Sequence, residues 1–408
     1  MKKNAVIIDS YSHGSYHEVI NQSYLMMISE LYDHVTYVAD ESSCENLKTL
    51  MNKCSFDYSN VKFIYKKTKS YFINLKYGSL NHFQKILIVS WLNFIWTKKF
   101  VKENCDVFFN GNIFLALWLL RFFDYRQSNL YIMCHSEMEG IDKKENTAFV
   151  NKLFFDPFLR ISFRHMNIPS RFHFILLSSF MEKYFKSRIS KKNAKNIFSI
   201  DHAYIRPFVD RPMTDESKSN ELFVGIPAAI NKGRGLNVLK EILKNNIADS
   251  VLIQSISFIT EKINSPHFKS LNETGRLLPF EEYNRFVNKM DILLFLYDKG
   301  SYKLTASGAI LEAIWNQKPI IALHNYYFDY IFEKFGNLGF LCDSIDELVD
   351  KINEIASGRK VLARFSDNLR KAKEALLPQN VKKQLEAIIG SNQKDMPARH
   401  PEFVLGRA

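Results

Sequence analysis

The sequence predicts an α/β protein made of two doubly wound domains, each with a parallel sheet covered by helices. Short apolar runs with little polar alternation recur along the chain, which is typical of strands buried on both faces. Segments with helical spacing of apolar residues lie between these runs, as in β-α-β units. The length of 408 residues fits two domains of about 200 residues better than a single core.

The first predicted domain spans residues 1–205. Its expected strands are Ala5–Ile8, Val35–Val38, Val61–Tyr65, Asp106–Asn110, Leu130–Cys134 and His173–Leu177. Between the first two strands, Ser23–Tyr32 carries Leu25, Ile28 and Leu31 at helical spacing and is expected to form a helix.

A polar segment with two prolines, residues 206–220, predicts a linker. The second predicted domain spans 221–375, with a helix over Gly235–Lys244. Its expected strands are Glu221–Ile226, Val251–Ser255, Asp291–Leu296 and Pro319–Ala322. Residues 376–394 predict a helix that packs back on the first domain. Residues 395–408 lose hydrophobic periodicity and predict a tail.

Composition limits the class of function. A charged fraction of 24% and widespread apolar residues exclude wholesale disorder, and only 15 glycines exclude a collagen-like chain. Lys and Arg outnumber Asp and Glu by 55 to 43, which gives a net charge of +12. A basic protein of this kind binds nucleic acid, an anionic membrane surface or anionic small molecules.

The cysteines and the apolar runs indicate the cellular compartment in which the protein is expected. The scattered cysteines are Cys44, Cys54, Cys105, Cys134 and Cys342. Their odd number and the lack of a C-x-x-C pair favour a reducing compartment. The apolar runs Ile86–Trp96 and Ile113–Phe123 are shorter than the roughly 20 residues of a spanning helix. The first apolar run stops at Asp9, too early for a signal peptide, so we expect a cytoplasmic protein.

The most informative segment runs from Tyr302 to Ala322. A strand ends, a polar loop follows, and a helix is expected to begin near Ser307, capped by Thr305 or Ser307. The free N–H groups at such a helix start bind anions. Glu312 follows about one and a half turns later, and its carboxylate can accept hydrogen bonds from both ribose hydroxyls. The alternative is an ordinary capped helix with a solvated Glu.

This segment resembles the donor-site signature of GT-B glycosyltransferases, especially the bacterial family-four type that builds surface polysaccharides. Ser307, Gly308, Glu312 and Pro319 match the signature. The resemblance covers the second domain in order and the first loosely. It implies two Rossmann-like domains facing a central cleft. It also implies a donor site in which the helix start holds the diphosphate and Glu312 the ribose, with Tyr302 and Thr305 in the preceding loop.

One position departs from that family. Its retaining members carry a second Glu eight residues before the ribose-binding Glu, and here this position is Leu304. The resemblance therefore leaves open whether the sugar's configuration is inverted or retained.

A second segment, Gly225–Leu236, combines a strand end, glycines and two cations before a helix. It is not a P-loop, because no G-x4-G-K-[ST] is present. The resemblance implies that Lys232, Gly233 and Arg234 clamp the diphosphate, whereas composition alone also fits a solvated basic loop. A third segment, Leu277–Tyr283, would hold the nucleobase through backbone groups. The resemblance implies a UDP-, GDP- or dTDP-sugar as the donor, and neither a cofactor nor a metal is expected.

Two loops of the first domain follow predicted strands and are expected at the cleft. Ser10–Glu18 contains His13, Gly14 and His17. Cys134–Gly140 contains His135 and Glu137, the first candidates for a base that accepts the acceptor's proton, followed by His17. The alternative for each histidine is a polar residue satisfied by its own loop.

Three segments of the first domain mix cations with aromatic residues: Lys62–Lys76, Trp91–Lys102 and Arg160–Arg171. This composition suits contact with anionic lipid headgroups. It equally fits core helices with a solvated Lys face. Nucleic-acid binding is disfavoured, because no helix-turn-helix, zinc or RNA-recognition motif accompanies the segments.

The sequence therefore predicts a glycosyltransferase, of hexosyltransferase type, that moves a sugar from a nucleotide-diphosphate donor to a hydroxyl of a glycan acceptor. A lipid-linked acceptor for capsule, O-antigen or exopolysaccharide synthesis is expected, with the protein peripheral on the inner membrane face. Two alternatives remain: a sugar-nucleotide epimerase of the same fold, and a non-catalytic basic protein that binds membrane or nucleic acid.

Overall fold

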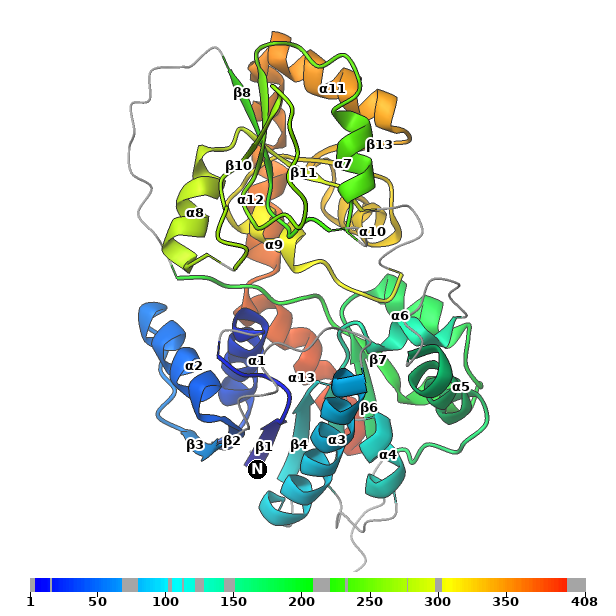
Figure 1. Cartoon of the computed structure of the whole chain (residues 1–408). Helices are drawn as coiled ribbons and strands as arrows, with labels where there is room; N and C mark the ends of the chain where they lie inside the picture. The colour runs from blue at the N-terminus through cyan, green and yellow to red at the C-terminus, as the bar shows by residue number, and fades with distance from the viewer. Residues whose placement is uncertain are drawn as a thin grey trace, which may run out of the picture.

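Two parallel α/β domains stack on each other in the computed structural model (Figure 1). The structure describes residues 4–14, 17–67, 80–101, 105–111, 114–121, 128–142, 151–207, 221–231, 234–276, 278–297 and 303–394. The predicted tail and most of the predicted linker lie outside these ranges. The predicted α/β class with two parallel sheets is confirmed.

The N-terminal sheet has the strand order β3-β2-β1-β4-β5-β6-β7. Its strands are β1 (Asn4–Asp9), β2 (His34–Asp40), β3 (Val61–Lys66), β4 (Cys105–Asn110), β5 (Leu130–Met133), β6 (Phe172–Leu176) and β7 (Ile197–Ser199). The helices are α1 (Glu18–Leu31), α2 (Glu41–Lys53), α3 (Leu80–Phe100), α4 (Phe114–Leu120), α5 (Asp156–Arg164) and α6 (Ser179–Lys186). Shorter helical segments are η2 (Glu137–Ile141), η3 (Asn151–Phe155) and η4 (Asn193–Asn196). The core strands β1, β4, β5 and β6 are buried almost throughout, which explains their unbroken apolar runs.

The C-terminal sheet has the order β10-β9-β8-β11-β12-β13. Its strands are β8 (Leu222–Ile226), β9 (Val251–Ser255), β10 (Phe268–Ser270), β11 (Ile292–Phe295), β12 (Ile320–Leu323) and β13 (Gly339–Cys342). The helices are α7 (Leu236–Ile242), α8 (Phe280–Lys289), α9 (Gly308–Trp315), α10 (Tyr326–Phe335), α11 (Ile345–Ser357), α12 (Ser366–Ala375) and α13 (Pro378–Lys394), with η5 (Arg359–Phe365) before α12.

Each sheet has a switch point where the strand order reverses. β1 lies between β2 and β4, and β8 lies between β9 and β11. In such sheets, ligands bind outside the carboxyl ends of the strands at the switch point. The loops that follow β1 and β4, and those that follow β8 and β11, are therefore the places to look for a site, with the loop after β5 next to them.

The chain crosses back at its C-terminal end, where α13 packs on α1 of the N-terminal domain (Figure 1). Lys382 of α13 forms an ion pair with Glu30 of α1. Asp201 accepts a hydrogen bond from Gln384 Nε2 at 2.6 Å and pairs with Lys334 of the C-terminal domain. Asp201 precedes the predicted linker, so its contacts connect the segment between the domains, residues 201–207, to α13 and to the C-terminal domain.

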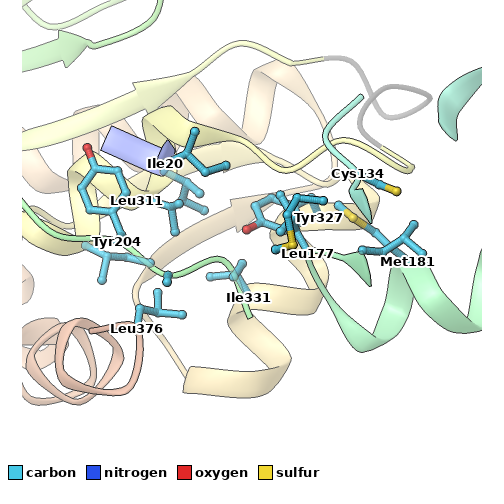
Figure 2. Close-up of a cluster of buried hydrophobic side chains, with 14 of the residues drawn as sticks. Ile20, Cys134, Leu177, Met181, Tyr204, Leu311, Tyr327, Ile331 and Leu376 are labelled. Carbon is cyan, nitrogen blue, oxygen red and sulfur yellow. The ribbon is translucent and has the colours of Figure 1, made fainter. Parts of the chain in front are cut away.

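Buried apolar side chains also join the domains. Figure 2 shows Ile20 of α1 and Tyr204 in the same cluster as Leu311 of α9 and Leu376. Such burial removes apolar surface from water and fixes the geometry of the cleft above it. Within the part of the chain that the structure describes, no helix is both long and apolar enough to cross a bilayer.

Candidate active site

A cavity of about 960 Å³ lies between the two domains. Its walls come from the start of α1, the loop after β5 and residues 202–206 on one side. The other wall comes from the loop after β8, the start of α8 and the start of α9. This is the crevice at the two switch points that the topology predicts.

Helix α9 begins at the cavity without a side-chain cap. Ser307 occupies the N-cap position, but its hydroxyl makes no cap hydrogen bond and is buried without a partner in the described structure. The Thr305 hydroxyl donates instead to Glu139 at 2.9 Å. The expected capping by Thr305 or Ser307 is therefore wrong. A Cβ atom at Gly308 would meet nothing within 4 Å, so open space adjoins the first turn.

Glu312 points from α9 toward a buried arginine of the segment between the domains. Arg206 donates to Glu312 Oε1 from Nη2 at 2.6 Å and from Nε at 3.0 Å. Arg206 Nη1 also lies 3.4 Å from Oε1 of Glu18, at the start of α1. The guanidinium thus bridges carboxylates of both domains, and it lies 4.7 Å from the ring centre of Phe280.

The second oxygen of Glu312 is not used by Arg206. Glu312 Oε2 is buried and has no hydrogen-bond partner among the described residues. Because a buried carboxylate oxygen without a donor is costly, a ligand hydroxyl that donates to it would be favoured. Arg206 holds the carboxylate in place through the other oxygen.

A second contact crosses the cleft at the loop before α9. Glu139 of η2 accepts a hydrogen bond from the backbone N–H of Leu304 at 2.8 Å. Leu304 itself is buried. The position at which the sequence departs from the retaining pattern is therefore occupied by an apolar side chain, while an N-terminal-domain carboxylate contacts its backbone.

Three histidines gather on the N-terminal wall. His17 and His135 have ring centres 5.0 Å apart, and His202 lies on the same wall. Burial lowers the pKa of His17 and of His202 to about 4, and lowers that of His135 well below its usual range. The lowered pKa keeps these imidazoles neutral near pH 7, so they can accept a hydrogen bond, and it weakens them as bases. His135 Nε2 is buried without a partner in the described structure.

The Glu137 carboxylate forms a hydrogen bond within its own loop. Its Oε2 accepts a hydrogen bond from the backbone N–H of His135 at 2.7 Å, and it is not among the residues that line the cavity. Burial raises the pKa of Glu137. The carboxylate thus holds the loop that presents His135.

The other N-terminal candidates lie away from the cavity. His13 Nε2 is 2.9 Å from Lys85 Nζ of α3. The Gly14 N–H donates to the Ser42 hydroxyl at 2.9 Å. His13 and Gly14 do not line the cavity, whereas His17, at the start of α1, does. His17 has a left-handed backbone with φ 60°, which turns the chain into α1.

The loop after β8 contributes Arg234, which is exposed and lines the cavity. Its backbone N–H closes a tight turn on Asn231 O at 2.8 Å. Gly235 follows with φ 74°, and a Cβ atom there would lie 2.3 Å from Leu296, so only glycine fits. The predicted donor residues Lys232, Gly233 and Tyr302 lie outside the described residues.

The predicted nucleobase loop also reaches the cavity. Leu278, Pro279 and Phe280 line it, and α8 begins at Phe280. Tyr283 Oη donates to Pro227 O at 3.3 Å and ties this helix to the loop after β8. Residues of both loops therefore line the cavity.

The site as a whole suits a polar ligand with hydroxyl and anionic groups. Ser307 Oγ, Glu312 Oε2 and His135 Nε2 are all buried, all unpartnered within the described structure, and come from residues that line one cavity. Buried polar atoms in native proteins are usually paired, so a ligand in this cavity that supplies partners to these three atoms would be favoured. The described residues contain no group of three or more His, Cys, Asp or Glu that could hold a metal ion.

Several residues of the site were missed by sequence reasoning. Arg206 was counted in the linker, and Glu18, Glu139 and His202 were not singled out. Arg206 and Glu18 meet only through the tertiary fold, as does the contact of Glu139 with the loop before α9. The usable signals were the positions of Glu18 in Ser10–Glu18 and of Glu139 in Cys134–Gly140, the two loops expected at the cleft.

No protein-family model matches the sequence, and no curated protein matches it. Solved structures match nearly the whole chain. HepE from Anabaena, solved with UDP-glucose, is 12% identical with a TM-score of 0.60, covering 96% of this chain and 100% of its own. A TarM variant from S. aureus, solved with UDP, Fondaparinux and α-GlcNAc-glycerol, is 11% identical with a TM-score of 0.59, covering 95% and 99%.

WaaG, a glycosyltransferase involved in lipopolysaccharide biosynthesis, is 12% identical with a TM-score of 0.55, covering 95% of this chain and 99% of its own. At these identities the likeness concerns the fold. Together with the two facing parallel sheets, it shows that the chain has the GT-B fold, as the sequence predicted.

The buried histidines predict a dependence of stability on pH. The unfolded chain protonates His17 near pH 6.5 and the folded chain only near pH 4, so this group's contribution to stability is lost as pH falls through that window. We expect His17→Asn to flatten the fall in melting temperature between about pH 6.5 and 4, since Asn tolerates the left-handed backbone. Glu137, whose pKa is raised, contributes with the opposite sign. Parallel melting profiles for the two proteins would contradict the prediction.

Proposed function

We propose that this protein is a glycosyltransferase that moves a sugar from a nucleotide-diphosphate donor to a hydroxyl of a glycan. The observation that carries the proposal is the convergence of Ser307, Glu312 and His135 on one interdomain cavity, each with a buried unpartnered polar atom. The GT-B neighbours support it, because two of them were solved with UDP or UDP-glucose.

The donor would lie against the C-terminal wall. Its diphosphate accepts hydrogen bonds from the start of α9, helped by the helix dipole and by the Ser307 hydroxyl. Arg234 of the loop after β8, on the same wall, neutralises the diphosphate charge. The resemblance implies the same role for Lys232, which lies outside the described residues. The ribose hydroxyls donate to Glu312, which Arg206 holds in place.

The acceptor would enter on the N-terminal wall. Its hydroxyl oxygen bonds to the anomeric carbon of the sugar as the bond from that carbon to the β-phosphate oxygen breaks. The nucleoside diphosphate leaves with the electron pair, and the hydroxyl loses its proton. A neutral His135 can take this proton, while His17 packs beside it. Closure of the two domains over the bound donor would exclude water and so limit its hydrolysis.

The acceptor is proposed to be lipid-linked and the protein peripheral on the cytoplasmic face of a membrane, in the synthesis of a bacterial surface polysaccharide. The basic and aromatic segments of the N-terminal domain support this proposal. The likeness to WaaG, a glycosyltransferase involved in lipopolysaccharide biosynthesis, points the same way.

The ribose contact can be tested by nucleotide binding. We expect UDP, GDP, dTDP or CMP to raise the melting temperature, and Glu312→Ala to weaken binding of the stabilising nucleotide roughly 10- to 100-fold, because a charged hydrogen-bond acceptor is lost. Glu312→Gln keeps the shape of the buried side chain and guards against misfolding. The matched control is Glu386→Ala, an exposed Glu of α13.

Wild-type affinity in folded Glu312→Ala protein would show that the ribose lies elsewhere. If no nucleotide stabilises the wild-type protein, the donor site itself is refuted, and a non-catalytic protein becomes the better account.

The proposed base can be tested by release of the nucleoside diphosphate from a nucleotide sugar, with water as acceptor. His135→Ala is expected to lower this rate by roughly 100-fold or more while sparing nucleotide affinity, because a general base contributes that much. Glu137→Gln is expected to lower it less, because its role is to hold the loop. Full rates in both variants would move the base to another residue.

A further inference from the structure

Most of the large apolar side chains that the described structure exposes lie on the N-terminal domain, on α3, α4, η3 and α5. We define the apolar face by six of them: Leu87, Trp91 and Ile95 of α3, Trp118 of α4, and Leu153 and Phe154 of η3. Single exposed apolar residues are ordinary, but a group on adjoining elements marks an interaction surface.

Helix α3 supplies the centre of the apolar face. Leu87, Trp91 and Ile95 are 44%, 53% and 39% exposed, and their spacing of four residues places them along one side of the helix. Another side, which includes Val89 and Trp96, is buried in the domain. The helix therefore carries one apolar stripe for the core and a second for a partner.

The other elements extend this stripe. Phe83 at the start of α3 has its ring centre 4.9 Å from that of Phe154 in η3. Trp118 of α4 packs on Phe158 of α5 at 4.8 Å, and its indole N–H donates to the Ser162 hydroxyl at 3.1 Å. Ring contacts of this kind hold the apolar face in place at little cost in conformational entropy.

The exposed charged residues named on these elements are positive. The sequences of α3, α4 and η3 contain no Asp or Glu, and the single acidic residue of α5, Asp156, is buried. Lys98 and Lys99 end α3 and are exposed, and Lys152 stands exposed beside Leu153 in η3. Protein interfaces are depleted of lysine, whereas tryptophan beside lysine is typical of the interface of an anionic bilayer.

We infer that the apolar face is the surface by which this protein binds a bilayer that carries anionic headgroups. Its apolar side chains enter the boundary between headgroups and acyl chains, and Lys98, Lys99 and Lys152 contact the headgroups. The inference rests on the proposed function, in which the acceptor is held in a membrane, and it assigns the residues that reach that membrane.

The apolar face is joined to the acceptor wall of the cleft. Ser10, in the loop after β1, donates to Asn93 of α3 at 2.6 Å. Arg160 of α5 donates to Gly140 O at 3.1 Å in η2, the segment that follows His135. The helices that carry the apolar face therefore also support both N-terminal loops of the site, so membrane binding would place the acceptor wall beside the lipid.

The test compares wild-type protein with the double variant Leu87→Ser/Trp91→Ser on vesicles of pure phosphatidylcholine and of phosphatidylcholine with phosphatidylglycerol. Wild type is expected to sediment with the anionic vesicles, with a blue shift of tryptophan fluorescence, and to bind them at least roughly tenfold more tightly than the double variant. The Lys98→Glu/Lys99→Glu variant is expected to bind the anionic vesicles more weakly than wild type. Its vesicle binding should also change less with salt concentration. Tyr326→Ser, at a side chain 37% exposed on the C-terminal domain, is the matched control.

Equal vesicle binding by wild type and the double variant, or none by wild type, overturns the inference. The inference is also overturned if the wild-type protein is a dimer and the double variant is a monomer, since the apolar face would then bind a second copy of the chain. Nucleotide stabilisation measured on the same samples separates the two proposals. Vesicle binding without stabilisation by a nucleotide would refute the donor site alone. Stabilisation by a nucleotide without vesicle binding would refute the role of the apolar face alone.

Discussion

The ion pair between Arg206 and Glu312 is the interaction on which the site depends. Arg206 belongs to the segment between the domains, and its guanidinium also reaches Glu18 of the N-terminal domain. Both partners of the main pair are largely buried, so removing either one leaves a charge without compensation, at a cost of roughly 3 to 5 kcal/mol. The pair orients the carboxylate that we assign to the ribose and couples that carboxylate to the position of the opposite domain.

Around this pair, the fold supplies the rest of the site from loops at the carboxyl ends of parallel strands. The loop after β5 brings His135 and Glu139, and the segment after β11 brings Thr305 and Ser307. The helix start and the loop after β8 suit an anion, whereas the neutral histidines opposite suit a hydroxyl. A cavity with one anion-binding wall and one proton-accepting wall matches transfer of a group from a diphosphate to an alcohol.

The fold was predictable to a large extent, because the buried strands of a parallel sheet leave unbroken apolar runs in the sequence. The strands β7 and β10 were missed, since three residues carry little pattern, and the four-residue β13 was also missed. Local motifs predicted Ser307 and Glu312 at the cavity. Arg206 and Glu139 could not be predicted in this way, because their partners are more than 100 residues distant in the sequence. His13 and His17 are neighbours in one loop, and only their packing shows that His17 alone lines the cavity.

A crystal structure of the complex with UDP, or with whichever nucleotide stabilises the protein, would locate the donor site. We predict the diphosphate at the first turn of α9, within hydrogen-bond distance of Ser307 Oγ. We also predict a ribose hydroxyl about 3 Å from Glu312 Oε2, with the pair between Arg206 and Glu312 intact. A nucleotide bound outside the interdomain cavity, or one whose ribose leaves Glu312 uncontacted, would contradict these predictions.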